Sequence, residues 1–373
     1  MFDLIHQNIV PLKKDKFHKH CNLLAKQPID EKYYKHLDAN TNHLIYDMDI
    51  NNHSKETVMD HYESLDDRVL TCTDGFYYFG MTFPTSMSKQ PSNLELFSSY
   101  EHSRKISQYS DIIKHRGTIA DTVMGLVFTG LIVCKKSDPE HLHINVENMT
   151  QTKSNFNHLI IHVQNPKQTI NIEYKRREEE CKFVKITLLI DAGCDVTVNE
   201  VILGNSQVSF DVVCGEYARL RHHIQQLPNS YSHYVSNVTM NTGSDVQIKH
   251  ISWAKNNNSI NLFNNVYHSH KGVYDFISRT IAQDMSKIHV EGLINVTKRD
   301  THSSTEWNHK GLMLDEMCSI SGSPQLNIKT KEVTATHGFA VSEPDKEILN
   351  YLSSRGMSEH KALQNVCVGH ISI

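Results

Sequence analysis

Short strand-like segments follow one another from about residue 125 to residue 342, and no long helical pattern interrupts them. In several of these segments apolar and polar residues alternate with a period of two, which is the pattern of a half-buried strand. The alternating segments lie at residues 141–146, 170–174 and 196–198, and further strand-like segments lie at residues 159–163, 184–190, 246–251 and 326–328. Such a series over about 200 residues favours a sandwich, a barrel or a β-solenoid.

Glycines punctuate this region at a spacing close to that of a solenoid repeat. Gly193, Gly215, Gly243 and Gly272 are separated by 22, 28 and 29 residues, and many solenoid repeats span about 20–30 residues. A solenoid grows by adding rungs, so it accommodates this length more easily than one sandwich does. The repeat is loose and has no strict sequence period, and spacing alone leaves the three architectures open.

The segment before residue 125 has a different character. Residues 1–45 are polar and have helical spacing of apolar residues, and Pro28 stops the first helical run. Residues 46–120 show a mixture of helical and short strand-like patterns. Thr73, Asp74 and Gly75 separate two short apolar runs and predict a hairpin turn there.

The C-terminal segment predicts two helices. Pro344 stands at an expected first helical position, Gly356 follows the first helix, Ser358 is the expected cap of the second, and Gly369 is expected to end it. Such a helical hairpin can cover the open end of a solenoid. We therefore expect an N-terminal helical or mixed domain at residues 1–124, a β core at 125–342 and a C-terminal helical hairpin at 343–373.

Cysteine usage and hydropathy indicate a cytoplasmic protein. The closest of the eight cysteines, Cys181 and Cys194, are 13 residues apart, so the chain has no CxxC pair and a disulfide framework is not favoured. The most apolar stretch, at residues 123–133, is too short to cross a bilayer of about 30 Å as a helix. The N-terminus shows no apolar run of signal-peptide length, so we expect no membrane association.

Charge and histidine content argue against nucleic acid and against a built-in metal site. The 38 basic and 42 acidic residues give a formal net charge of −4, which provides no overall attraction to nucleic acid. The 25 histidines include several His-x-His pairs. No carboxylate or thiol stands at a spacing that would complete a zinc site beside them, so they are interpreted as polar surface.

No sequence pattern indicates an enzyme. The phosphate-binding GxxxxGK[ST] pattern, GxGxxG, GxSxG and HExxH are all absent from the sequence. A β-helix enzyme acting on carbohydrate remains an alternative, and it would need paired carboxylates in a groove or a calcium site on one face of the solenoid. The sequence nominates no such cluster.

The most specific pattern lies in linked segments near the C-terminus. They read KGLMLDEMCSISG at residues 310–322, SPQLNI at 323–328, VTATHG at 333–338 and ILNYLSSRG at 348–356. In order and spacing they closely resemble the end of the SufB/SufD family, and its SufD branch in particular. The strong resemblance covers about residues 300–360, and a fainter one extends back to about residue 125.

This resemblance implies a non-catalytic scaffold subunit of the SUF iron–sulfur cluster assembly machinery. Members of the family have a right-handed parallel β-helix core between an N-terminal helical domain and a C-terminal helical domain. A SufD-like chain pairs with a SufB-like subunit through the ends of their β-helices, and the C-terminal helices hold the ATPase SufC. The chain is expected to bind no cofactor alone, while a nascent cluster forms in the complex.

The resemblance also nominates residues for the interface. His337 matches the histidine that SufD contributes to the interfacial site, as a metal ligand only in complex with a SufB-like partner, and Gly338 lets another backbone approach. Some SufD members carry a cysteine where this chain has Ala335, and SufB members carry an essential cysteine that aligns with Ile328. The partner would therefore supply thiolate.

The C-terminal hairpin provides candidates for docking SufC, and packing on the end of the solenoid is an alternative role for the same side chains. The sequence ends at Ile373, where members of the family usually continue with a further helix. Alternatives for the whole chain are a diverged, solitary β-helix interaction protein outside cluster assembly, and a homodimer when the chain is alone. The SufC-docking candidates are Leu349, Tyr351, Leu352, Arg355, Met357 and Leu363.

Overall fold

The structure is a computed structural model. It describes residues 71–73, 76–79, 95–97, 109–136 and 140–373, with gaps at residues 115, 117, 119, 121–128, 147–153, 175–180, 229–230, 269 and 299–301. The helices expected in residues 1–45 lie outside the described residues, as does most of the expected domain at residues 1–124.

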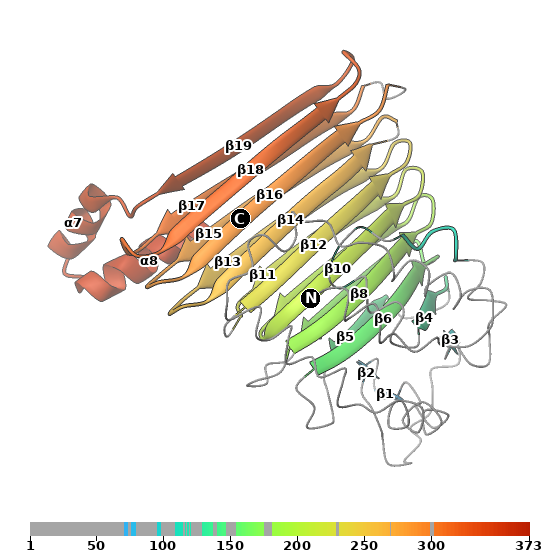
Figure 1. Ribbon diagram of the computed structural model, residues 1–373, viewed down its shortest axis with the longest axis horizontal. Helices are drawn as coiled ribbons and strands as arrows, with labels where there is room; N and C mark the ends of the chain where they lie inside the picture. The colour runs from blue at the N-terminus through green and yellow to red at the C-terminus, as the bar shows by residue number, and fades with distance from the viewer. Residues whose placement is uncertain are drawn as a thin grey trace, which may run out of the picture.

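The chain winds into a β-solenoid with two sheets (Figure 1). From β4 (Thr129–Cys134) onward each strand lies in the sheet opposite to that of the strand before it, and every second strand pairs in parallel. Each coil therefore adds one strand to each sheet. This connectivity is that of a solenoid, which confirms the architecture expected from the resemblance and excludes the sandwich and the barrel.

The first sheet has ten strands, in the order β1 (Thr71–Thr73), β2 (Phe76–Phe79), β5 (His141–Val146), β7 (Lys167–Tyr174), β9 (Asp195–Ile202), β11 (Arg219–Gln226), β13 (Asp245–Ala254), β15 (Val273–Ala282), β17 (Ser304–Met313) and β19 (Thr334–Ser342). The second sheet has nine, in the order β18 (Ser319–Ile328), β16 (Lys287–Val296), β14 (Ser259–His268), β12 (Tyr231–Met240), β10 (Asn205–Cys214), β8 (Cys181–Ile190), β6 (Ser154–Val163), β4 and β3 (Glu95–Phe97). Antiparallel pairing joins β1 to β2 and β3 to β4, and the first pair confirms the expected hairpin.

The core lies between the two sheets because side chains on a strand alternate between its two faces. On β13, every second residue is buried and the residues between them are only partly buried. Val196 and Ile248 of the first sheet share one apolar cluster with Val212 and Leu262 of the second. The period-two pattern of the sequence thus reports which side chains enter the solenoid.

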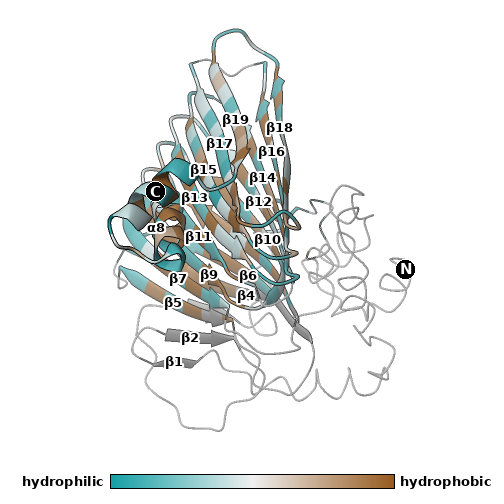
Figure 2. Cartoon of the chain, turned by 90° about the vertical axis from the view of Figure 1, so that its left-hand side faces the viewer, coloured by the Kyte–Doolittle hydropathy of each residue, from teal (hydrophilic) through white to brown (hydrophobic). Residues whose placement is uncertain are grey.

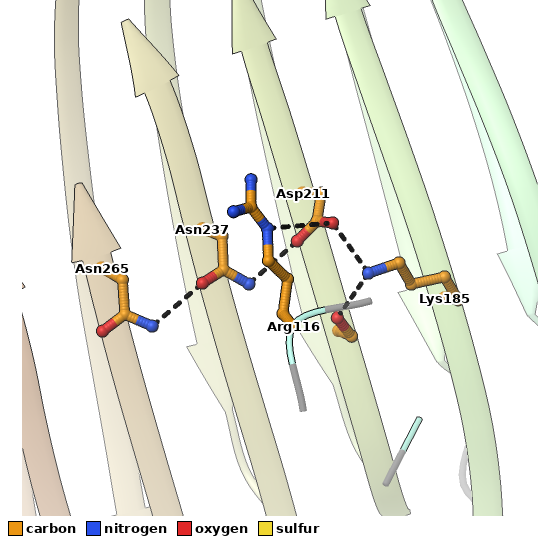
Figure 3. A network of polar contacts seen from close by, with 6 residues as sticks. Arg116, Lys185, Asp211, Asn237 and Asn265 are labelled. Carbon is orange, nitrogen blue, oxygen red and sulfur yellow. Dashed lines mark hydrogen bonds and ion pairs between the residues drawn. The ribbon is translucent and has the colours of Figure 1, made fainter. Parts of the chain in front are cut away.

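The second sheet is covered on its outer face as well, since β10, β12 and β14 are buried on both faces. Figure 3 shows a polar network on this face. Asp211 accepts hydrogen bonds from Lys185 Nζ at 2.8 Å and Asn237 Nδ2 at 2.9 Å, and Asn265 Nδ2 donates to Asn237 at 2.9 Å. Arg116 Nε lies 3.8 Å from the same carboxylate. The fully buried Lys185 ammonium is thereby paired, as a buried charge requires.

Two helices follow β19, namely α7 (Lys346–Ser354) and α8 (Glu359–Ile371). Ser358 caps α8 as expected, and Gly356 has a φ of 88° after the end of α7, which suits a glycine. The cap of α7 is Asp345, so the expectation that Pro344 is the first helical residue is wrong. The expected end at Gly369 is also wrong, because α8 continues to Ile371. No described helix has the length and apolar character needed to cross a membrane.

The helix α8 packs against the outer face of the first sheet rather than over the open end (Figure 2). Cys367 of α8 forms an apolar cluster with Ile281 of β15 and Leu312 of β17. His370 Nε2 lies 3.2 Å from the carbonyl oxygens of Thr280 and Lys310, one on each of the same two strands. The expectation that the helical hairpin covers the end of the solenoid is therefore wrong, and the last rung stays uncovered by α8.

Candidate functional site

The last rung of the solenoid consists of β18 and β19, and it ends both sheets. Within the described residues, β18 pairs only with β16 and β19 only with β17. Each terminal strand therefore has one edge whose backbone N–H and C=O groups have no neighbouring strand. Such an edge is a template for pairing with another chain.

The apolar interior is also open at this rung. Ile320, Ile328 and Phe339 are only partly buried while they pack against the core, and Leu326 is 37% exposed. In the preceding rung the corresponding interior residues, such as Ile288 and Ile294, are almost fully buried. The open end thus combines unpaired strand edges with exposed core side chains.

His337 lies on β19 at this open end. It pairs in register with Trp307 of β17, whose side chain belongs to the core. Residues paired in register point to the same face of a sheet, so His337 is on the interior-facing side of β19. No further rung covers it within the part of the chain that the structure describes, and it is exposed. The position at the end of the solenoid that the sequence predicted for His337 is found, while its role as a metal ligand stays a prediction.

Gly338 lies on the opposite side of β19, in register with Asn308. A Cβ atom built on Gly338 would have Asn308 Nδ2 at 3.5 Å as its nearest neighbour, which is an ordinary contact. The fold of this chain therefore does not itself need a glycine there. The expected close approach of another backbone at Gly338 stays a prediction.

The open end offers an imidazole but no thiolate. Neither β18 nor β19 contains a cysteine, and Ala335 stands two residues before His337 on the same side of the strand. Ile328 ends β18 and packs against the core. In the parts of the chain that the structure describes, no group of three or more His, Cys, Asp or Glu side chains is arranged to hold a metal ion.

Two interior residues next to this end were missed by the sequence analysis. The imidazole of His309, in β17, stacks on the ring of Phe339, with centroids 4.9 Å apart and planes 18° apart. The two residues pair in register, so both face the interior. Gly322 is the one sequence feature that points to the position of Phe339. A Cβ atom at position 322 would collide with the Phe339 ring, so the ring needs a glycine there.

The helix α7 presents an apolar face without a partner among the described residues. It has no buried residue, and Ile348 and Tyr351 are 49% and 57% exposed. Leu349 and Leu352 are half-buried, and the Arg355 guanidinium lies 5.2 Å from the centroid of the Tyr351 ring. Of the expected docking candidates on α7, Tyr351 and Arg355 are thus exposed, while Leu349 and Leu352 are only partly accessible.

The remaining two candidates connect the helices to each other and to the sheet. Asn365 Nδ2 donates to the Met357 sulfur at 3.3 Å, which joins the loop between the helices to α8. Leu363 packs against the cluster of Ile281 and Leu312. Leu363 therefore helps to hold α8 on the solenoid, and any role in docking a partner stays a prediction.

Comparisons with known proteins point to one family. A family model described as "SUF system FeS cluster assembly, SufBD core domain" matches residues 143–370, more than half of the chain. The iron-sulfur cluster assembly protein SufD of Escherichia coli (strain K12) is 29% identical over 90 residues. That alignment covers 24% of this chain and 21% of the relative.

Proposed function

Because this chain belongs to the SufB/SufD family, by a SufBD core domain that spans residues 143–370, we propose that it is a SufD-like, non-catalytic scaffold subunit of SUF iron–sulfur cluster assembly. In this role the open end of the solenoid pairs with a SufB-like subunit, and the C-terminal helices bind a SufC-like ATPase. The expected location is the cytoplasm.

The uncovered last rung carries this proposal. The edges of β18 and β19 have no partner strand among the described residues, and core side chains such as Leu326 are exposed beside them. A second β-helix end would continue both sheets, pair the open backbone groups and bury the apolar interior in one step. Few other partners would satisfy two parallel sheet edges together.

His337 would act at the junction of the two solenoids. A neutral imidazole ligates iron and replaces thiolate at some cluster sites. Since β18 and β19 carry no cysteine, the thiolates for a nascent cluster would come from the partner. The cluster is the cargo of the complex rather than a resident cofactor of this chain.

The exposed face of α7 would receive the ATPase subunit. Tyr351 and Ile348 are largely exposed, and α7 buries no residue of its own. The helix α8, by contrast, is held on β15 and β17 by Cys367, Leu363 and His370. Motion of the ATPase would thus reach the solenoid through α8, one rung away from the docking end.

Co-purification tests this proposal directly. The tagged full chain is co-expressed with a SufB-like and a SufC-like protein, and the stoichiometry of the purified complex is measured by native mass spectrometry. We expect a complex containing all three proteins. Recovery of the chain alone or only as a homodimer would contradict the proposal and favour the solitary β-helix protein.

A further inference from the structure

His309 occupies a particular place beside the docking end. It lies in β17, one rung before β19, and its side chain is fully buried in the solenoid. Its ring is the surface on which Phe339 of the terminal strand stacks. Phe339 is two residues after His337, so both side chains lie on the same side of β19.

Hydrogen bonds from the preceding rung hold the His309 ring. Its Nδ1 lies 3.1 Å from Ser278 Oγ, and its Nε2 lies 3.4 Å from Thr280 Oγ1. Ser278 Oγ also lies 3.0 Å from His250 Nδ1, and His250 Nε2 lies 2.9 Å from Gln226 Oε1. These side chains form one continuous polar row inside the solenoid, from β11 to β17.

The amide of Gln226 sets the direction of every hydrogen bond in this row. Its Nε2 donates to Ser232 Oγ at 2.7 Å, so its Oε1 accepts from His250 Nε2. His250 Nδ1 then accepts from the Ser278 hydroxyl, whose oxygen accepts from His309 Nδ1. Burial lowers the pKa values of both imidazoles to about 3, so both are neutral. The His309 ring therefore has one tautomer and one orientation.

The other sheet holds Phe339 from the opposite side. Gly322 of β18 leaves the space that the Phe339 ring fills, and a Cβ atom there would also lie 2.5 Å from the Val290 carbonyl oxygen. Phe339 thus stacks on the imidazole of His309 and fills the space that Gly322 leaves in the facing strand. Its ring therefore contacts both strands that belong to the end of the solenoid, β17 beneath it and β18 opposite it.

We propose that His309 is a positioning residue for the docking end: through Phe339 it fixes the terminal strand β19 and so sets the place of His337. A terminal strand is hydrogen-bonded on one side only. The stack of Phe339 on His309 adds a side-chain contact that stabilises β19 where no further strand does. This inference rests on the proposed docking function, because it assigns His309 to the same site.

Hydrogen exchange on the full chain alone tests this stacking contact without any partner. In His309→Ala, we expect amide exchange in residues 334–342 to rise about tenfold relative to residues 181–190 of β8, which do not contact His309; this is the factor that a lost aromatic contact corresponds to. His309→Phe retains the stack and is expected to restore protection. His233→Ala is the matched control, since it removes a buried histidine of β12 that lies outside this row and packs against Phe263 instead. An equal rise in His233→Ala, or no rise in His309→Ala, would overturn the inference.

Two further experiments address a His309→Ala variant that does not fold and the effect of His309 in the assembled complex. If His309→Ala does not fold, Phe339→Ala removes the other ring of the stack and should release residues 334–342 in the same way. In the complex with a SufB-like partner, His309→Ala should lower cluster formation and His309→Phe should restore it. Normal cluster formation by His337→Ala would reject the ligand role, while the exchange data would still decide whether His309 locks β19.

Discussion

Glu200 Oε2 lies 2.9 Å from His222 Nε2 inside the solenoid, and both side chains are fully buried. The hydroxyl groups of Tyr174 and Tyr234 donate to the same carboxyl group, each at 2.6 Å. Burial and the neighbouring Glu200 raise the pKa values of both tyrosines well above their ordinary value, which keeps them as donors. The carboxyl group of Glu200 thus joins strands of both sheets.

Removing this carboxyl group should destabilise the solenoid strongly. We expect Glu200→Ala to lower the free energy of unfolding by about 3–5 kcal/mol, because the buried partners lose their acceptor. Urea unfolding provides the measurement. The control is Glu306→Ala, at an exposed position of β17, where a change within about 0.5 kcal/mol is expected. Similar losses in the two variants would show that the buried cluster adds nothing.

The two buried imidazoles of the polar row should make stability depend on pH. Burial lowers the pKa of His250 and of His309 from 6.5 to about 3, with smaller contributions from His222 and His309 at the former and from Arg279 and His370 at the latter. Their stabilising effect is complete above pH 6.5 and is lost as pH falls toward 3, because only the unfolded chain takes up the protons.

Unfolding midpoints in urea at pH 7, 6 and 5 measure this effect. Each histidine should contribute up to about 1.4 kcal/mol per pH unit below pH 6.5. His309→Phe should remove the share of one histidine from the slope. An unchanged slope in this variant would mean that another group is responsible.

Loss of the His337 imidazole should affect assembly and not folding. His337 is exposed, so we expect His337→Ala to change the free energy of unfolding by less than about 0.5 kcal/mol. In the complex with a SufB-like partner, cluster formation followed by visible absorption should fall about tenfold or more, as for loss of a metal-ligand interaction. Thr336→Ala, on the opposite side of β19, is the control.

A larger side chain at position 338 should weaken pairing with the partner. The nearest atom to a Cβ atom there is Asn308 Nδ2 at 3.5 Å, so Gly338→Val should leave the isolated chain folded. We expect its dissociation constant for the SufB-like subunit to rise about tenfold. Thr197→Val, on the outer face of β9 and far from the end, should bind normally. Equal affinities for the two variants would place the partner elsewhere.

Polar substitutions on α7 should release the ATPase subunit. Ile348 and Tyr351 are exposed, so the double variant Ile348→Ser and Tyr351→Ser should retain the stability of the chain. Binding of the SufC-like protein, measured by calorimetry, should weaken about tenfold or more. Val368→Ser, at a 52% exposed position of α8, tests whether the effect is specific to α7. Loss of binding only in Val368→Ser would move the docking face to α8.

The strands could be predicted from the sequence, but the regular repeat of the solenoid could not. The residues in the turns explain the difference. Gly193 and Gly243 have φ values of 74° and 71°, and Tyr217 and Lys271 adopt the same left-handed conformation in neighbouring turns. Gly215 has a different role, because a Cβ atom there would lie 2.7 Å from the Ile190 carbonyl oxygen. Gly272 lies one residue after the left-handed Lys271, at a third position of the turn. The glycine spacing therefore mixed three structural positions, and residues other than glycine occupied part of the repeated one.

The interior polar row could not be predicted from alternation. In β11 the residues His222 and His223 are adjacent, yet only His222 is buried in the solenoid. A period-two pattern assigns polar residues to the outside, so buried polar groups such as His309 are invisible to it. The position of His337 was predictable because the motif around it is specific, whereas the stacking of Phe339 on His309 depends on the register of β17 and β19, strands that are far apart in the sequence.

If the proposed pairing holds, the uncovered last rung makes the state of each copy of this protein depend on the supply of its partner. A copy produced in excess retains two unpaired strand edges beside exposed apolar side chains, and such edges favour self-association and aggregation. Balanced synthesis of the two subunits would protect this end from the moment it folds.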